Sequence, residues 1–287
     1  MRIRTLEPAR VALESAVITH GLPRPQNLEA ARQMQTAIRA ADAVPAIVAV
    51  LSGTPCIGIS DDELVELANH PAPSKIALHN LSLACAMRWT GGTTVSATAY
   101  LAHRAGIQVM ATGGIGGVHR DGRDISSDLP TLARTPILVV CSGAKVILDL
   151  PATREWLETH GIPIVGYQTD ELPGFYVART GLRVDATVED VDALIALWEA
   201  HQAMGTAMLV VQPPPAAHAF SEPEMRALLE QALHEAEQAG IRGSATTPWL
   251  LARLAQLSGG RTVQTNLALL CANASLAGQL AARLSTR

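Results

Sequence analysis

Lys145 stands out because the chain otherwise avoids lysine. Of the 287 residues, 22 are lysine or arginine, and only Lys75 and Lys145 are lysines, although lysine is normally among the commonest residues. A lysine amine can lose its proton and attack an electrophilic carbon, whereas a guanidinium stays charged. Lys145 follows an apolar run and ends the small-residue turn SGAK. We therefore interpret Lys145 as a candidate nucleophile; the alternative is an accidental survivor of a bias toward arginine.

A glycine-rich segment, TGGIGG at residues 112–117, lies upstream of this turn. It is not a dinucleotide fingerprint, because His119 stands where GxGxxG requires its third glycine. Glycines let backbone N–H groups approach an anion such as a phosphate closely. The pattern fits such an anion site and fits a plain tight turn equally well.

A polar cluster follows the glycines and contains His119, Asp124 and Asp128. Carboxylates that leave room for several water ligands suit Mg²⁺ or Mn²⁺. The cluster is therefore a candidate hard-metal site, with a solvated polar loop as the alternative.

Glu14 interrupts the apolar run Val11–Ile18 near the N-terminus. A carboxyl group is costly to bury unless it is paired or protonated. A buried Glu14 would have a raised pKa and could act as a general acid; a glutamate at a strand end that faces water is the alternative.

These residues lie in a chain whose predicted strands and helices alternate from end to end. Such alternation predicts one α/β domain over residues 1–287, with a mostly parallel sheet flanked by helices. Asn27, Ser60 and Thr187 are predicted to begin helices, Ser60 through a capping box with Glu63. The predicted strands cover residues 46–51, 54–59, 137–141, 162–166 and 207–211, and the predicted helices cover 25–42, 60–70, 93–104, 187–204, 221–239, 247–258 and 265–284.

Composition excludes several classes of partner. The net charge is −4 and there is no basic run, which argues against nucleic acid. No apolar stretch is expected to reach transmembrane length, and no signal peptide is recognised. The four cysteines are scattered without CxxC spacing, which is typical of buried thiols in a reducing compartment. We expect a cytoplasmic protein without a membrane partner.

Several long segments are similar to the pseudouridine-5′-phosphate glycosidase family, which includes indigoidine synthase A-like proteins. The resemblance is carried in family order by VALESAVITHGLPRPQN (11–27), GGTT (91–94), TGGIGGVHR (112–120), DISSDL (124–129), CSGAKVILDL (141–150), GYQTDELPGF (166–175), TPWLLARLAQLSGGRTVQTN (247–266) and ANASLAGQLA (272–281). It implies an α/β fold, a homotrimer, a divalent metal such as Mn²⁺, and cleavage of pseudouridine 5′-phosphate to uracil and ribose 5-phosphate.

The resemblance also implies roles for particular residues. Lys145 corresponds to the nucleophile that forms an imine, Glu14 to the proton donor and Asp124 to the metal ligand. The positions that match substrate-binding segments of the family are Lys75, Thr94, Val95, His119, Ser126, Ser127, Asp128 and Asn266. Two other functions remain open: a Schiff-base lyase acting on another sugar phosphate, and a phosphosugar-binding protein without turnover.

Overall fold

A twisted, mostly parallel sheet forms the centre of the molecule. The computed structural model describes residues 1–3, 9–120, 122, 124–242 and 246–286. Seven strands run parallel to one another in the order β3 (Val44–Leu51), β2 (Arg10–Leu13), β7 (Val109–Ala111), β8 (Leu138–Cys141), β11 (Met208–Val211), β9 (Ile164–Tyr167) and β10 (Ala186–Val188). The predicted α/β class with a mostly parallel sheet is confirmed.

The long strand β3 continues beyond this parallel region into a smaller extension. Its second half pairs antiparallel with β4 (Thr54–Ile57) and with β6 (Gly91–Thr93). Strand β6 in turn pairs parallel with β5 (Ser74–Ile76), while β1 (Arg2–Ile3) lies along β4. The extension bears on the predicted site because β5 carries Lys75, one of the predicted substrate-binding residues.

Strands β2 and β6 meet at their carboxyl ends beside Val48, where β3 changes partners. The hydroxyls of Ser15 and Thr93 both donate to the Val48 carbonyl, over 2.5 and 2.7 Å. The two segments are also joined directly, because the backbone N–H of Ser15 donates to the Thr93 carbonyl and that of Thr93 donates to Ser15 Oγ. Ser15 follows Glu14, so this junction fixes the chain on both sides of the site.

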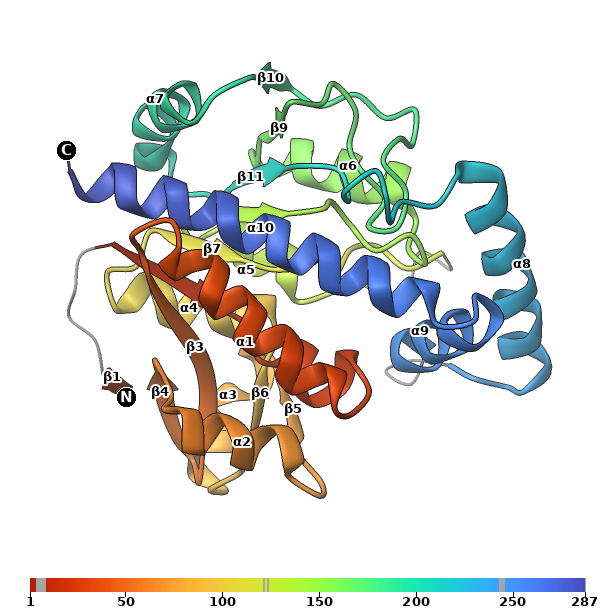
Figure 1. Ribbon diagram of the computed structural model, residues 1–287, viewed down its shortest axis with the longest axis horizontal. Helices are drawn as coiled ribbons and strands as arrows, with labels where there is room; N and C mark the ends of the chain where they lie inside the picture. The colour runs from red at the N-terminus through yellow and green to blue at the C-terminus, as the bar shows by residue number, and fades with distance from the viewer. Residues whose placement is uncertain (4–8, 121, 123, 243–245, 287) are drawn as a thin grey trace.

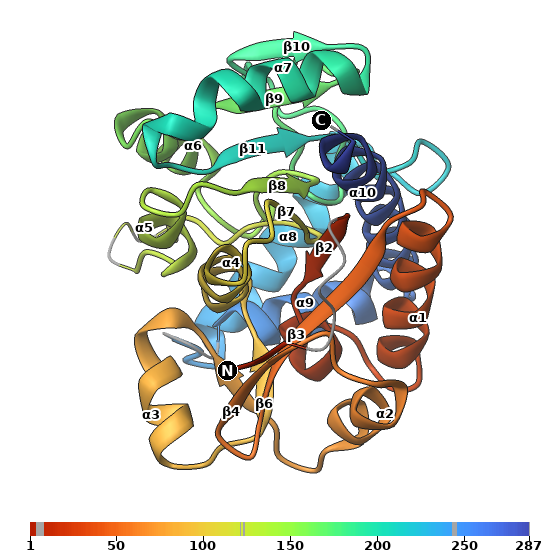
Figure 2. The same ribbon diagram turned by 90° about the vertical axis from the view of Figure 1, so that its left-hand side faces the viewer.

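Helices cover both faces of the sheet, as Figure 2 shows. Helices α1 (Gln26–Arg39) and α10 (Arg261–Ser285) lie on one face, and α4 (Val95–Arg104), α5 (Asp128–Leu132) and α6 (Leu150–Thr159) lie on the other. The remaining helices lie at the periphery: α2 (Asp61–Asn69), α3 (Leu81–Ala86), α7 (Val191–His201), α8 (Glu222–Gln238) and α9 (Thr246–Leu257). Short π- and 3₁₀-helical turns occupy Val17–Gly21, Leu78–Asn80 and Gln202–Met204.

Some helix starts follow the prediction and others do not. Ser60 and Glu63 form the expected capping box at the start of α2. The predicted helix cap Thr187 lies instead in β10. It pairs with β9 together with its neighbours Ala186 and Val188. The residue that caps α7 is Asp190, whose carboxylate accepts from the backbone N–H of Ala193 over 2.8 Å.

The start of the first helix and the end of the strand before it also differ from expectation. Pro25 is the cap position of α1, and the side chain of Asn27 donates instead to the carbonyls of Ile18 and Ala68. The apolar run around Glu14 is not one strand, because β2 ends at Leu13 and the segment 17–21 turns as a π-helix. Glu14 consequently lies just beyond a strand end.

Helix α10 corrects the expectation that no segment reaches transmembrane length. It has 25 residues, and its most apolar window has a mean hydropathy of 1.3, so it qualifies by length and composition. Half of that window is buried where α10 packs against β2, β7, β8 and α1. This contact pattern is that of a core helix lying across a sheet (Figure 1).

Candidate active site

Three neighbouring parallel strands deliver the candidate residues to one edge of the sheet. Glu14 follows β2, Thr112 follows β7, and Lys145 ends the turn after β8. Carboxyl ends of parallel strands share an edge, where backbone groups and loop side chains can face a ligand. The residues predicted to be acid and nucleophile are therefore brought to the carboxyl ends of β2 and β8, with β7 and the glycine-rich turn that follows it between them.

Glu14 is buried, with 9% of its surface exposed. Burial raises the pKa of its carboxyl group, while the positive charge of Lys145 and a hydrogen bond from Thr112 Oγ1 to Glu14 Oε1 lower it. Burial is the strongest of these influences, so the pKa is raised on balance. Glu14 is therefore a carboxyl group that retains its proton to higher pH than an exposed glutamate, as a general acid requires.

The Lys145 amine is held by the glycine-rich turn. Its Nζ donates to the Gly114 carbonyl over 2.9 Å, and its backbone N–H donates to the Ile115 carbonyl. Gly114 itself cannot bear a side chain, because a Cβ there would lie 2.6 Å from a ring carbon of Phe175 and 2.9 Å from the Gly143 carbonyl. Close packing is thus one reason for glycine at this position.

Lys75 and Asp128 complete an electrostatic cluster around these two residues. Lys75 is exposed as a residue, but lost hydration around its amine and the nearby charge of Lys145 lower its pKa, while Asp128 and Glu14 raise it. The charges of Lys75, Asp128 and Lys145 in turn influence the pKa of Glu14. We call Glu14, Lys75, Asp128 and Lys145 the charged cluster.

Asp128 joins the start of α4 to the glycine-rich turn. One carboxylate oxygen accepts from the backbone N–H of Ser96 and the other from that of Gly116, each over 2.9 Å. Asp128 therefore occupies the N-terminus of α4, where the helix dipole favours a negative charge. The glycine-rich turn was a candidate anion site, but the backbone N–H of Gly116 already binds a carboxylate of the chain itself.

Hydroxyl groups from two segments meet beside Asp128. Ser96 Oγ lies 3.1 Å from Ser127 Oγ and 2.9 Å from Thr94 Oγ1. Val95 is the buried first residue of α4, and Ser126 Oγ accepts from the backbone N–H of Asp128. The fold thus brings together the predicted substrate-binding segments 94–95 and 126–128. Ser96 belongs to the same group of hydroxyls but was not predicted from the sequence.

His119 and Asp124 form a separate pair on an exposed loop. His119 Nε2 lies 3.7 Å from Asp124 Oδ2, and the Asp124 side chain is 48% exposed. Asp121, which lies between these two residues in the sequence, is outside the described residues. Within the described ranges no three His, Cys, Asp or Glu side chains gather as metal ligands. One carboxylate and one imidazole suit a divalent ion that keeps most of its water ligands.

Two buried asparagines on α10 face the strand ends. Asn266 Oδ1 has no hydrogen-bond partner among the described residues, and it lies 3.3 Å from where a Cβ on Gly113 would stand. Asn273 is fully buried and donates from Nδ2 to the Thr112 carbonyl over 2.8 Å. Their spacing of seven in an apolar helix signals one polar face, but only the structure shows that it meets the glycine-rich turn.

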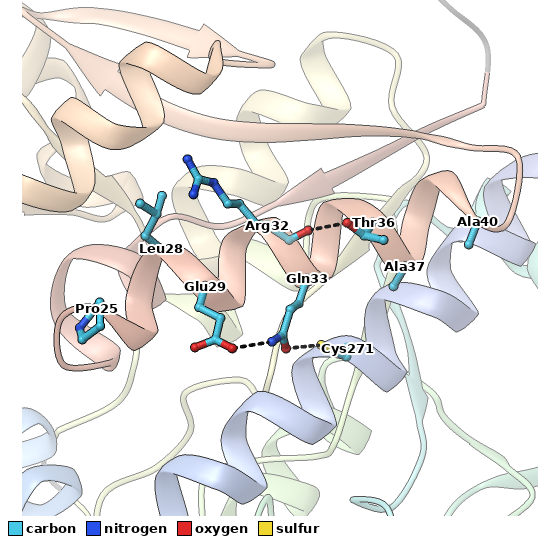
Figure 3. Close-up of a pocket in the computed structure, with 9 residues that line it drawn as sticks. All are labelled: Pro25, Leu28, Glu29, Arg32, Gln33, Thr36, Ala37, Ala40 and Cys271. Carbon is cyan, nitrogen blue, oxygen red and sulfur yellow. Dashed lines mark hydrogen bonds between the residues drawn. The ribbon is translucent and has the colours of Figure 1, made fainter.

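A groove of about 600 Å³ lies between α1 and α10 and is separate from these strand ends (Figure 3). Gln33 crosses it, donating to Glu29 Oε1 over 2.9 Å and accepting from the Cys271 thiol over 3.4 Å. The nine lining residues contain no lysine or histidine that could pair with these groups in catalysis. The strand-end edge remains the better candidate site.

Known proteins resemble this chain over nearly its whole length. The sequence profile described as "Indigoidine synthase A like protein" matches residues 4–283. The chain belongs to this family. Among relatives, it is 50% identical over 279 residues to the pseudouridine-5′-phosphate glycosidase of Gemmatimonas aurantiaca, covering 96% of this chain and 91% of that protein. It is 49% identical over 279 residues to the protein of the same name from Methylobacterium nodulans, covering 96% and 83%. The resemblance read from the sequence motifs is confirmed.

Solved structures agree with the family assignment. The indigoidine synthase A-like protein of Thermotoga maritima superposes with a TM-score of 0.92 at 35% identity, covering 99% of this chain and 96% of that one. Prealnumycin C-glycosynthase AlnA, solved in complex with ribulose 5-phosphate, gives 0.91 at 36% identity, covering 100% and 98%. The family fold and the described fold are therefore the same.

Proposed function

We propose that this protein cleaves the C–C glycosidic bond of pseudouridine 5′-phosphate, giving uracil and ribose 5-phosphate through an imine on Lys145. The observation that carries the proposal is the placement of a buried acid and an amine at the carboxyl ends of β2 and β8, on either side of β7, where the charge of Lys145 acts on Glu14. The names of the relatives support the substrate, and AlnA supports a phosphorylated five-carbon sugar as the ligand.

The first step opens the ribose ring. Ordinary glycosidases use two carboxyl groups and an oxygen leaving group, but the aglycone here is joined through carbon. Lys145 first loses one proton to solvent; Glu14 then donates its own proton to the ring oxygen while the Lys145 amine attacks C1′. The C1′–O4′ bond breaks as the C1′–N bond forms, leaving an open-chain sugar attached to Lys145.

The second step breaks the C–C bond. The adduct nitrogen returns a proton to the Glu14 carboxylate, and a proton from solvent adds to C5 of uracil. The nitrogen lone pair then forms the imine, and the electron pair of the C1′–C5 bond restores the C5=C6 double bond of uracil. Water hydrolyses the imine, so the net reaction consumes one water and regenerates Lys145.

The other predicted residues bind and orient the substrate. Lys75 supplies a cation for the phosphate, and hydroxyls of Thr94, Ser126 and Ser127 supply hydrogen-bond partners. The unpaired, buried Oδ1 of Asn266 offers an acceptor to a substrate N–H or O–H group.

A divalent metal such as Mn²⁺ belongs to the same proposal. Asp124 would hold it, with His119 beside it and water completing the shell. When bound, such an ion offsets negative charge on the substrate and polarises a ligand.

The direct test is incubation with pseudouridine 5′-phosphate, with and without Mn²⁺, followed by chromatography for uracil. Borohydride added during turnover should trap a stable adduct, with a mass equal to protein plus reduced ribose 5-phosphate. Peptide mapping should place it on Lys145, with Lys75 and the N-terminal amine as internal controls.

The other possible outcomes lead to different conclusions about the function or the mechanism. Trapping with another sugar phosphate, without uracil release from this substrate, would indicate the Schiff-base lyase. Binding of ribose 5-phosphate without uracil release or trapping would indicate a phosphosugar-binding protein. Uracil release without any adduct would disprove the covalent mechanism while leaving the reaction intact.

A further inference from the structure

Thr112 links the general acid to the sheet and to α10. Its side chain is buried, and its hydroxyl donates to Glu14 Oε1. Its backbone N–H donates to the Val140 carbonyl over 3.0 Å, and its carbonyl accepts from Asn273 Nδ2 over 2.8 Å. Both backbone groups of Thr112 are thus held while its side chain reaches Glu14.

Asn273 joins the carboxyl ends of three adjacent strands. Besides Thr112 after β7, its Nδ2 donates to Ser142 Oγ after β8 over 3.2 Å. Its Oδ1 accepts from Gln212 Nε2 after β11 over 2.9 Å. A fully buried amide with every polar atom paired is expensive to disrupt and fixes the geometry of its partners.

We propose that Thr112 is a positioning residue that orients the Glu14 carboxyl group and controls its protonation. Asn273 in turn keeps Thr112 in place. The proposal rests on the role of Glu14 as proton donor in the proposed function. It does not make Thr112 or Asn273 a group that touches the substrate.

Charged groups also face Glu14, so the effect of Thr112 must be separated from theirs. Lys145 from the turn after β8 and Lys75 from β5 lower the pKa of Glu14, whereas Asp128 from α5 raises it. Thr112 is the neutral partner, and its hydroxyl favours the carboxylate form by donating to it. Replacing it changes the hydrogen bond and leaves the charge of the site unchanged.

The test compares Thr112→Val, which exchanges the hydroxyl for a methyl group, with Thr112→Ser, which keeps the hydroxyl. Carbon-13 NMR of labelled glutamate follows the Glu14 carboxyl, identified by its absence in Glu14→Gln. We expect Thr112→Val to raise the Glu14 titration midpoint by about one pH unit, since a hydrogen bond to a charged group is lost. Thr112→Ser should titrate near the wild-type midpoint.

Turnover should report the same shift. Because Glu14 acts in its protonated form, the alkaline limb of kcat/KM should move to higher pH in Thr112→Val, and kcat at the optimum should fall about tenfold as orientation is lost. A midpoint unchanged by Thr112→Val, or a Thr112→Ser that behaves like Thr112→Val, would overturn the proposal.

Asn273 is tested through its coupling to Thr112. Asn273→Leu should lower the melting temperature and raise the Glu14 midpoint, and adding Thr112→Val should produce no further rise because both act through one hydroxyl. Additive rises in the double variant would show that Asn273 acts independently and would overturn that part.

The NMR titration needs no substrate, so the two proposals fail separately. A protein that releases no uracil but shows the expected midpoints would refute the proposed reaction and leave the Thr112 contact as described. If Asn273→Leu does not fold, the Thr112 pair alone decides the central claim.

Discussion

Glu14 and Asp124, the two carboxyl groups to which we assign chemistry, lie in opposite surroundings. Glu14 is 9% exposed, at a strand end, with a hydrogen bond from Thr112 and a positive charge nearby. The Asp124 side chain is 48% exposed, on a loop, with His119 at 3.7 Å. One carboxyl group is held inside the protein and the other remains in water.

The two surroundings suit the two carboxyl groups to different chemistry. Burial penalises a carboxylate and so favours a proton-carrying acid, whereas an exposed carboxylate can accept a hydrated cation. Changes at the buried group should therefore alter the chemical step, and changes at the exposed group should alter metal dependence.

The largest effect is expected for Lys145→Arg, which keeps the positive charge inside the charged cluster but cannot form an imine. Turnover should fall by several orders of magnitude, measured as uracil release at saturating substrate. Circular dichroism and thermal melting should show that the fold is retained. Full activity in this variant would end the covalent mechanism.

Glu14→Gln removes the buried acid while preserving its size and an oxygen for Thr112. We expect kcat to fall by about 10²- to 10⁴-fold, as for loss of a general acid. Metal affinity, measured by Mn²⁺ titration, should stay unchanged because Asp124 lies on a separate loop. A loss of Mn²⁺ affinity would contradict the division between the two carboxyl groups.

The same variant should change how stability depends on pH. Folding raises the pKa of Glu14 above its ordinary 4.5, so the stabilisation from its proton is fully present below that value and is lost as pH rises through the folded-state pKa. Glutamine has no such proton. The free energy of unfolding of Glu14→Gln should therefore decline less than that of wild type on raising the pH, as measured by urea denaturation at several pH values.

Asp124→Ala tests the exposed group. Activity should fall about tenfold at limiting Mn²⁺ and recover partly when the metal is in excess, because the ligand and not the acid is lost. The exposed position predicts a change in unfolding free energy within about 0.5 kcal/mol. Unaltered Mn²⁺ dependence would remove Asp124 from the metal proposal.

The smallest effect is expected for Lys75→Arg, which retains a cation for the phosphate. It should mainly raise KM by a few-fold and leave kcat nearly unchanged, because the contact serves ground state and transition state alike. It is also the matched control for Lys145→Arg, since the same substitution is made at the other lysine of the charged cluster. A comparable fall in kcat would show that Lys75 takes part in the chemical step.

The sequence predicts the fold well where a local signal agrees with the tertiary setting. Apolar runs became β3, β8, β9 and β11, and the Ser60 capping box began α2 as expected. It fails where pairing overrides a cap signal: Thr187 joined a strand because β9 offers it an edge, and Asp190 caps α7 instead. Such an edge cannot be read from the segment itself.

For the site, residue chemistry was more informative than spacing. The scarcity of lysine and an acid in an apolar run singled out Lys145 and Glu14 as candidates, and the fold brings them to the ends of β2 and β8, on either side of β7. Thr112 and Ser96 were not chosen, because a threonine or a serine gains its role only from what it contacts. Those contacts cross up to 161 residues of sequence, as between Asn273 and Thr112.

The junction at Val48 has a consequence for how the site can evolve. A single carbonyl in the middle of β3 accepts from both Ser15, next to the acid, and Thr93, next to the start of α4. Gly92 packs so closely there that a Cβ would lie 2.5 Å from the Ser15 carbonyl. An insertion or deletion inside β3 would shift the segment that carries Glu14 relative to the start of α4 and would break both hydrogen bonds. The structure therefore disfavours changes of length inside β3, and we expect new substrate ranges to arise from loops that surround a fixed junction.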